Sequence, residues 1–149
     1  HLTGELDWPE IKESLPSLPA ELQMKYHAFP YLHEEMAAAF SSADIVLSRA
    51  GASTLGELPF YSLPAILVPY PFAWKYQKVN ADYLADKGAA VVLENSTLDA
   101  RLLSTLDSIL GEKSRLQSMQ KAMAALAAPD AALKIADLVW ELAERTGRS

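Results

Sequence analysis

Residues 49–54, an arginine followed by five small residues, have the residue types and order that could bind a ligand. They read Arg-Ala-Gly-Ala-Ser-Thr and directly follow a short apolar stretch, residues 45–48. Gly51 and its small neighbours let a ligand come close to the backbone. The unpaired N–H groups of a first helical turn attract anions. Because ligands of parallel α/β sheets bind beyond the carboxyl ends of the strands, this run predicts a phosphate site.

Glu57, three residues after Thr54, has two interpretations. Its carboxylate could accept hydrogen bonds from a ligand. Alternatively, the order Thr-Leu-Gly-Glu fits a capping box, in which Glu57 only satisfies the first N–H donors of its own helix. The residue pattern alone leaves both interpretations open.

Three further polar side chains are candidates with equally open roles. Gln77 and Asn80 are three residues apart on a predicted helix, and on that spacing alone they could be solvated surface residues. Arg49 could contact a ligand, or it could pair with a carboxylate such as Asp44 and so fix the loop.

Composition and charge exclude several other kinds of site. His27 and His33 do not have the spacing of metal ligands, even with Glu34 and Glu35 beside the latter, so we predict neither a metal site nor a cofactor. The absence of cysteine excludes disulfides and thiolate chemistry and fits a reducing compartment. A formal net charge of −6 argues against binding to nucleic acid, which requires a clustered basic face.

The elements that would hold these residues alternate between strand and helix. Short apolar runs predict buried parallel strands at residues 23–29, 45–48, 65–68 and 90–93, with the end of another strand at residues 2–3. Helical composition predicts helices at residues 8–15, 34–41, 54–61, 75–87, 98–110, 113–126 and 130–145. This alternation predicts an α/β fold with a doubly wound parallel sheet, in a single domain over residues 1–149.

The N-terminus shows no signal peptide, and the longest uncharged stretch is not a membrane span. Residues 58–74 are uncharged, but prolines interrupt them and they are too short for a membrane span. The first residues, His-Leu-Thr-Gly, are not followed by the apolar run of a signal peptide. We therefore expect a chain that begins within a domain.

Several motifs, in order, resemble the C-terminal domain of the bacterial MurG family. They are SRAGASTLGEL at residues 48–58, LPAILVPYP at 63–71, YQKVNA at 76–81, KGAA at 87–90 and PDAA at 129–132. The resemblance covers nearly the whole chain. It implies a Rossmann-like parallel sheet that forms the C-terminal half of a GT-B glycosyltransferase. It also implies that the whole protein transfers N-acetylglucosamine from UDP-N-acetylglucosamine to the lipid-linked muramoyl-pentapeptide of peptidoglycan, with inversion at the anomeric carbon.

The resemblance assigns roles to individual residues of the donor site. Ala52, Ser53 and Thr54, with Arg49 and Gly51 in the same loop, would line the pyrophosphate and nucleoside. Glu57 would accept hydrogen bonds from the ribose hydroxyls, because two carboxylate oxygens can face a vicinal diol. Gln77, together with Asn80, would hold the sugar hydroxyls, and the main chain at His33 would contact uracil.

The sequence departs from the family at three places. Tyr76 stands where many members carry a histidine, at a position close to the expected sugar contacts. Residues 59–62, Pro-Phe-Tyr-Ser, replace a run of small residues that usually ends in glycine. The chain also lacks the Gly-Gly-Ser loop that follows the first strand of the family domain, and we expect it to begin beyond that strand.

The resemblance leaves the catalytic residues outside this sequence. In the family, the acceptor site and the base belong to the N-terminal domain, so we name no catalytic residue and expect this chain alone to be inactive. The whole enzyme would be cytoplasmic and peripheral on the inner face of the cell membrane.

Two alternative functions stay open at this point, and a third is disfavoured. The chain could be the donor domain of a diacylglycerol glucosyltransferase, or a non-catalytic nucleotide-sugar-binding subunit of a two-chain transferase. A UDP-sugar epimerase is disfavoured, because residues 72–77 lack its acidic and arginine pattern.

The predicted C-terminal helix has apolar residues around more of its circumference than one buried stripe needs. We expect part of this surface, with Trp140 at its centre, to be exposed or to cover a second copy of the chain. The alternative is that the preceding helix, residues 113–126, covers it completely.

Overall fold

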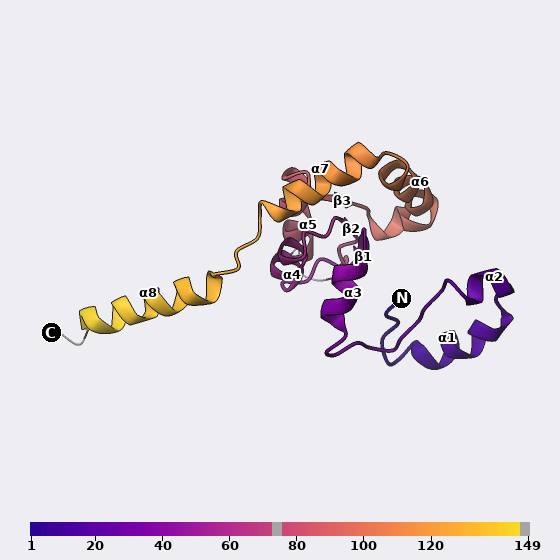
Figure 1. Ribbon diagram of the computed structural model, residues 1–149, viewed down its shortest axis with the longest axis horizontal. Helices are drawn as coiled ribbons and strands as arrows, with labels where there is room; N and C mark the ends of the chain where they lie inside the picture. Colours follow the sequence, from indigo (N-terminus) through magenta and orange to yellow (C-terminus); the bar gives the residue numbers. More distant parts are fainter. Residues whose placement is uncertain (73–75, 147–149) are drawn as a thin grey trace. The chain divides into compact units, whose positions relative to one another are not determined.

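The computed structural model describes residues 1–72 and 76–146. Contacts divide the chain into two compact units, His1–Ala39 and Phe40–Ser149, and each unit is described by itself. The prediction of a single domain over residues 1–149 stays a prediction. Figure 1 shows the order of the elements along the chain.

The first unit contains short helices and one isolated parallel bridge. The helices are α1 (Trp8–Ser14), the 3-10 turn η1 (Leu15–Ser17) and α2 (Ala20–Gln23). Leu2 forms a parallel bridge with Phe29, in which the Thr3 N–H donates to the Phe29 carbonyl at 3.0 Å. The predicted start of α1 is confirmed, although the Asp7 side chain forms no capping hydrogen bond.

The predicted strand at residues 23–29 is wrong. Gln23 ends α2, and the Tyr26 N–H donates to the Leu22 carbonyl at 2.8 Å, so the backbone turns where an extended strand was expected. Only Phe29 forms a bridge. Met24 is 75% exposed, whereas a strand inside a parallel sheet would be buried on both faces.

The helix α3 (Met36–Ser42) leads into the second unit, which contains a three-stranded parallel sheet in the order β1-β2-β3. The strands are β1 (Val46–Ser48), β2 (Ala65–Leu67) and β3 (Ala90–Val92). The helix α4 (Thr54–Phe60) joins the first two strands, and α5 (Tyr76–Asp86) precedes the third. The chain continues through η2 (Asn95–Thr97), α6 (Leu98–Leu110), α7 (Lys113–Ala124) and α8 (Ala131–Thr146).

The central strand β2 shows how the sheet is buried on both faces. Ala65 and Leu67 belong to one apolar cluster, which also contains Leu58 of α4, Leu84 of α5 and Met123 of α7. Ile66 of β2 and Val68, which directly follows the strand, belong to a second cluster with Ile109 of α6 and Met119 of α7. Successive strand residues point to opposite faces, so helices cover both faces of the sheet. The predicted α/β fold, a Rossmann-like parallel sheet with flanking helices, is confirmed.

Candidate functional site

The carboxyl ends of the three strands lie side by side and fix where the loops of the candidate site begin. Ser48 pairs in register with Leu67, and Leu67 pairs with Val92. The sheet is parallel, so the segments that follow these residues leave from one edge. The loop at residues 49–53 therefore starts beside the loop that begins at Val68.

Side chains hold two successive carbonyl groups of the loop at residues 49–53. The Arg49 carbonyl accepts hydrogen bonds from Ser48 Oγ at 3.0 Å and from Thr54 Oγ1 at 3.3 Å. The next carbonyl, that of Ala50, accepts a hydrogen bond from Asn80 Nδ2 of α5 at 3.0 Å. The conformation of the loop therefore depends on side chains from three separate elements.

The N–H groups that follow these carbonyls have no hydrogen-bond partner among the described residues. Within the described part of the chain, the N–H groups of Gly51, Ala52 and Ser53 donate to no carbonyl or side chain. A methyl group added at Gly51 would meet no atom within 4 Å, so the space beside this residue is open. Consecutive free N–H groups next to open space are suited to bind an anion.

Glu57 is exposed, and its carboxylate is not used as a cap. Ser53 occupies the N-cap position of α4 and has no side-chain capping bond, while Thr54 points its hydroxyl at the Arg49 carbonyl. The capping-box interpretation is therefore wrong. Among the described residues, no hydrogen bond or ion pair engages the Glu57 carboxylate.

Gln77 and Asn80 are half-buried and bonded to loop backbone, so the interpretation as solvated surface residues is wrong. Gln77 Oε1 accepts a hydrogen bond from the Tyr70 N–H at 2.8 Å, and Asn80 Nδ2 donates to the Ala50 carbonyl. The other half of each amide, Gln77 Nε2 and Asn80 Oδ1, has no partner among the described residues. These two side chains join the start of α5 to both neighbouring loops.

Arg49 fixes the loop, but with a different partner from the expected one. Its guanidinium donates from Nη1 to the Val68 carbonyl at 3.1 Å and lies 5.5 Å from the centre of the Tyr70 ring. In the described part of the chain, Arg49 forms no ion pair with Asp44. The expected carboxylate partner is thus corrected to a main-chain carbonyl and an aromatic face, a pairing that a guanidinium makes readily.

The remaining predicted residues are His33 and Tyr76. His33 belongs to the first unit, where its ring lies 4.7 Å from the ring of Tyr31. Its predicted contact with uracil stays a prediction. Tyr76, the first residue of α5, is 75% exposed.

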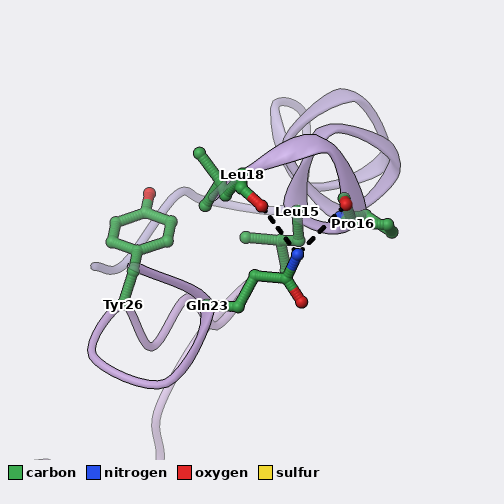
Figure 2. A pocket seen from close by; sticks show the side chains of 5 residues that line it. All are labelled: Leu15, Pro16, Leu18, Gln23 and Tyr26. Atoms are coloured by element: carbon green, nitrogen blue, oxygen red, sulfur yellow. Dashed lines mark hydrogen bonds between the residues drawn. The ribbon is translucent and has the colours of Figure 1, made fainter. Parts of the chain in front are cut away.

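A separate hollow lies within the first unit and has a different character (Figure 2). It is lined by Leu15, Pro16, Leu18, Gln23 and Tyr26. Gln23 Nε2 donates to the carbonyls of Pro16 at 3.1 Å and Leu18 at 2.7 Å. Its amide hydrogens are therefore occupied, and no charged side chain lines the hollow. It is a poor match for a phosphate.

Helix α5 also carries an ion pair on its surface. On α5, Lys78 Nζ donates to Asp82 Oδ2 at 2.6 Å, and this hydrogen bond and charge raise the pKa of Lys78 above its usual value. Both side chains are exposed, so the pair contributes little to stability. Residues 1–72 and 76–146 contain no cluster of histidine and acidic side chains that could hold a metal ion. Within the same ranges, no helix is long and apolar enough to cross a membrane.

Sequence reasoning missed two partners of this site, Ser48 and Tyr70. The sequence pattern indicates Ser48 as the end of a strand and the first residue of a motif, and Tyr70 as part of another motif. A serine beside a small-residue loop is a recognisable signal for a side-chain-to-backbone bond. The contribution of Tyr70 through its N–H had no such signal, because every residue except proline carries this donor.

Comparisons with known proteins agree on one family. The chain matches the glycosyltransferase family 28 C-terminal domain over residues 1–135. It is 41% identical to a protein of Gloeobacter violaceus, over 95% of this chain and 38% of that protein. It is 38% identical to a protein of Roseiflexus sp., over 97% of this chain and 37% of that protein. Both carry the name UDP-N-acetylglucosamine--N-acetylmuramyl-(pentapeptide) pyrophosphoryl-undecaprenol N-acetylglucosamine transferase.

A comparison of the fold with solved structures indicates the same family. The crystal structure of Acinetobacter baumannii MurG superposes with a TM-score of 0.80 at 32% identity, covering 95% of this chain and 40% of that one. The chain thus spans roughly two fifths of the length of the relatives it matches. The sequence match, the parallel sheet and the small-residue loop place the chain in one group: it belongs to the family of glycosyltransferase family 28 C-terminal domains and resembles the corresponding part of MurG.

Proposed function

We propose that this chain is the donor-binding part of an inverting glycosyltransferase of the MurG type. The donor is UDP-N-acetylglucosamine, and the acceptor is the lipid-linked muramoyl-pentapeptide of peptidoglycan synthesis. The names of the relatives, which match 95% and 97% of this chain, support this proposal. They favour it over a diacylglycerol glucosyltransferase and over a non-catalytic subunit.

The observation that carries the proposal is the free Glu57 carboxylate one helical turn beyond the unpaired N–H groups of the loop at residues 49–53. A UDP-sugar offers a diphosphate and a ribose diol. The N–H groups of Gly51, Ala52 and Ser53 suit the diphosphate, and a carboxylate suits the diol. Both ligand groups therefore find matching chemistry within a few residues.

Other polar groups would bind the rest of the donor. Gln77 Nε2 and Asn80 Oδ1, which have no partner among the described residues, are suited to sugar hydroxyls. Thr54 and Arg49 act through the loop, because their side chains are bonded to backbone carbonyls. His33 would contribute main-chain contacts to uracil.

The groups in this chain would assist the reaction at the sugar donor, by binding its diphosphate. Loop N–H donors that hold the diphosphate would stabilise the negative charge that develops on UDP as the glycosidic bond breaks. The base that activates the acceptor hydroxyl, and the acceptor site itself, would come from the remainder of the whole protein. That protein would work in the cytoplasm on the inner face of the membrane. Incubation of this chain alone with donor and lipid acceptor should therefore give no disaccharide.

Titration of the isotope-labelled chain with UDP, UDP-N-acetylglucosamine and UDP-glucose, followed by NMR, tests the proposal directly. We expect the amide signals of Gly51, Ala52 and Ser53 to shift with all three ligands. We expect tighter binding of UDP-N-acetylglucosamine than of UDP-glucose. If none of the ligands moves these signals at millimolar concentration, the proposed donor site is wrong.

A further inference from the structure

Asn80 is attached to the loop through a single backbone group, the Ala50 carbonyl. The side chain is half-buried, and its Nδ2 donates to this carbonyl at 3.0 Å across thirty residues of sequence. Ala50 itself is completely buried in the apolar cluster beneath the loop. Packing in the apolar cluster thus fixes the Ala50 side chain, and the hydrogen bond from Asn80 fixes its carbonyl.

The planarity of the peptide bond transmits this contact to the next residue. The carbonyl of Ala50 and the N–H of Gly51 belong to one peptide plane, and in a trans peptide they point in opposite directions. A hydrogen bond that fixes the carbonyl therefore also fixes the direction of the Gly51 N–H. That N–H is one of the unpaired donors of the loop.

The preceding peptide plane is fixed in the same way. The Arg49 carbonyl, held by Ser48 Oγ and Thr54 Oγ1, sets the direction of the Ala50 N–H. The difference lies in where the partners come from. Ser48 and Thr54 are neighbours of the loop in sequence, whereas Asn80 is on α5, next to the residues that are suited to the sugar.

We propose that Asn80 is a positioning residue, whose side-chain amide fixes the Ala50–Gly51 peptide plane and so aims the Gly51 N–H at the diphosphate of the nucleotide. This inference rests on the proposed function, and it goes further by giving Asn80 a role that acts through the backbone. A residue that only touched the sugar would leave binding of UDP unchanged.

Asn80→Ala separates the two roles. The variant and the wild-type chain are titrated with uridine, UDP and UDP-N-acetylglucosamine. We expect UDP to bind more weakly by roughly three- to tenfold, which is the usual value of one hydrogen bond, and UDP-N-acetylglucosamine by at least the same factor, because Asn80 Oδ1 is also suited to a sugar hydroxyl. Uridine, which has no phosphate, should bind as it does to the wild type. In the ligand-free chain, the Gly51 amide signal should already move.

Asn95→Ala provides the matched control, because Asn95 is an exposed asparagine in η2 and should change none of these values. Thermal unfolding of each variant reports whether it folds, and Asn80→Ser is the substitute if Asn80→Ala does not. Weaker binding of UDP-N-acetylglucosamine alone would show that Asn80 acts on the sugar and would overturn the proposal. Equal loss for uridine, or no loss for any ligand, would also overturn it.

The ligand-free measurement keeps this inference distinct from the proposed function. If the wild-type chain binds none of the nucleotides, the proposed function fails. The Gly51 amide signal in ligand-free Asn80→Ala then decides the positioning role alone. An unchanged signal would show that Asn80 does not orient this peptide plane.

Discussion

Glu57 and the free N–H groups before it are the residues on which the proposed chemistry depends. A glutamate in this position of a helix usually has a structural explanation, since it can cap its own first turn. In this chain the cap is not formed, and the carboxylate is exposed without a partner among the described residues. The capping box therefore does not account for Glu57, and its role toward a ligand stays a prediction.

Glu57→Gln should weaken binding of UDP and leave the thermal midpoint unchanged. The carboxylate offers two charged acceptors to the ribose diol, and the amide offers only one neutral acceptor. Hydrogen bonds to charged groups contribute about 1.5 to 3 kcal/mol, so the affinity should fall by about ten- to a hundredfold. Calorimetric titration and thermal unfolding of the same preparation measure both quantities. Glu13→Gln, at an exposed position of α1, is the control for the loss of one charge. A lower midpoint with unchanged affinity would return Glu57 to a structural role.

Gly51→Ala should have opposite effects on stability and on binding. The added methyl group meets no atom within 4 Å, and Gly51 is not in the left-handed region, so the fold should tolerate it. Replacing glycine at such a position restricts the unfolded chain and stabilises by about 0.4 to 1 kcal/mol. The same methyl group would occupy the space that we assign to the diphosphate, so UDP should bind more weakly. Gly56→Ala is the control: Gly56 lies in α4 and also has open space beside it, so alanine there should leave UDP affinity unchanged. Unchanged UDP affinity in Gly51→Ala would place the ligand elsewhere.

The sequence indicated which residues are candidates for binding, but it did not indicate their hydrogen-bond partners. The small-residue loop and Glu57 stand out because their residue types are unusual at that spacing. The partners of Arg49 could not be predicted, because one is the Val68 carbonyl, a group that every residue carries. Likewise, the half-burial of Gln77 and Asn80 depends on where α5 packs, which their own spacing does not reveal.

At the scale of elements, prediction succeeded for the apolar runs that pair in the sheet, whether fully buried as in β2 or only partly buried as in β1 and β3. The runs at residues 45–48, 65–68 and 90–93 became β1, β2 and β3, and each strand is one residue shorter at one end or the other. The run at residues 23–29 failed, because Gln23 belongs to α2 and Met24 and Lys25 form a turn. Its apolar residues were too few to distinguish a strand from a short helix and its turn, an ambiguity that periodicity alone does not resolve.

The end of α4 contains a residue in a costly conformation. Ser62 has φ 53°, the left-handed region that favours glycine. The Ser62 N–H donates to the Pro59 carbonyl at 3.0 Å, and the Leu63 N–H donates to the Leu58 carbonyl at 3.0 Å. These two bonds form a Schellman motif, in which the left-handed position is usually glycine. The family also usually carries glycine at the end of this run.

Ser62→Gly should therefore stabilise the chain. Glycine adopts the left-handed conformation without the steric cost of a Cβ atom, so the free energy of unfolding should rise by about 0.5 to 1 kcal/mol. Urea denaturation measures this change. Ser104→Gly, in the middle of α6, is the matched control and should lower stability by a similar amount, because glycine is unfavourable inside a helix. A loss of stability in Ser62→Gly would mean that the serine side chain contributes more than its backbone conformation costs.

At the scale of the whole molecule, α8 is the element whose surface is not explained by this chain. Its large apolar side chains are all between 59% and 70% exposed: Leu133, Ile135, Leu138, Val139, Trp140 and Leu142. The alternative that residues 113–126 cover this helix is therefore wrong. Monomers rarely expose apolar patches above a few hundred Å², so this surface needs a partner. The chain spans roughly two fifths of its relatives' length, and in a protein as long as these relatives another part of the chain would cover this surface.

In the isolated chain, we predict that α8 instead associates with a second copy. Sedimentation should show a larger species as the concentration rises, and the emission of Trp140 should shift to shorter wavelength as the ring leaves water. The difference between the wild type and Trp140→Phe isolates this signal from the other tryptophans.

Leu138→Glu, which introduces a charge into the apolar surface, should keep the chain monomeric. Asp137→Glu, on the same helix, should leave association unchanged. Each new contact buries aromatic and aliphatic area, so association should weaken on cooling, as hydrophobic contacts do. A chain that stays monomeric with Trp140 in water at every concentration would contradict self-association. A monomer with Trp140 fully buried would mean that α8 belongs to the core of this chain.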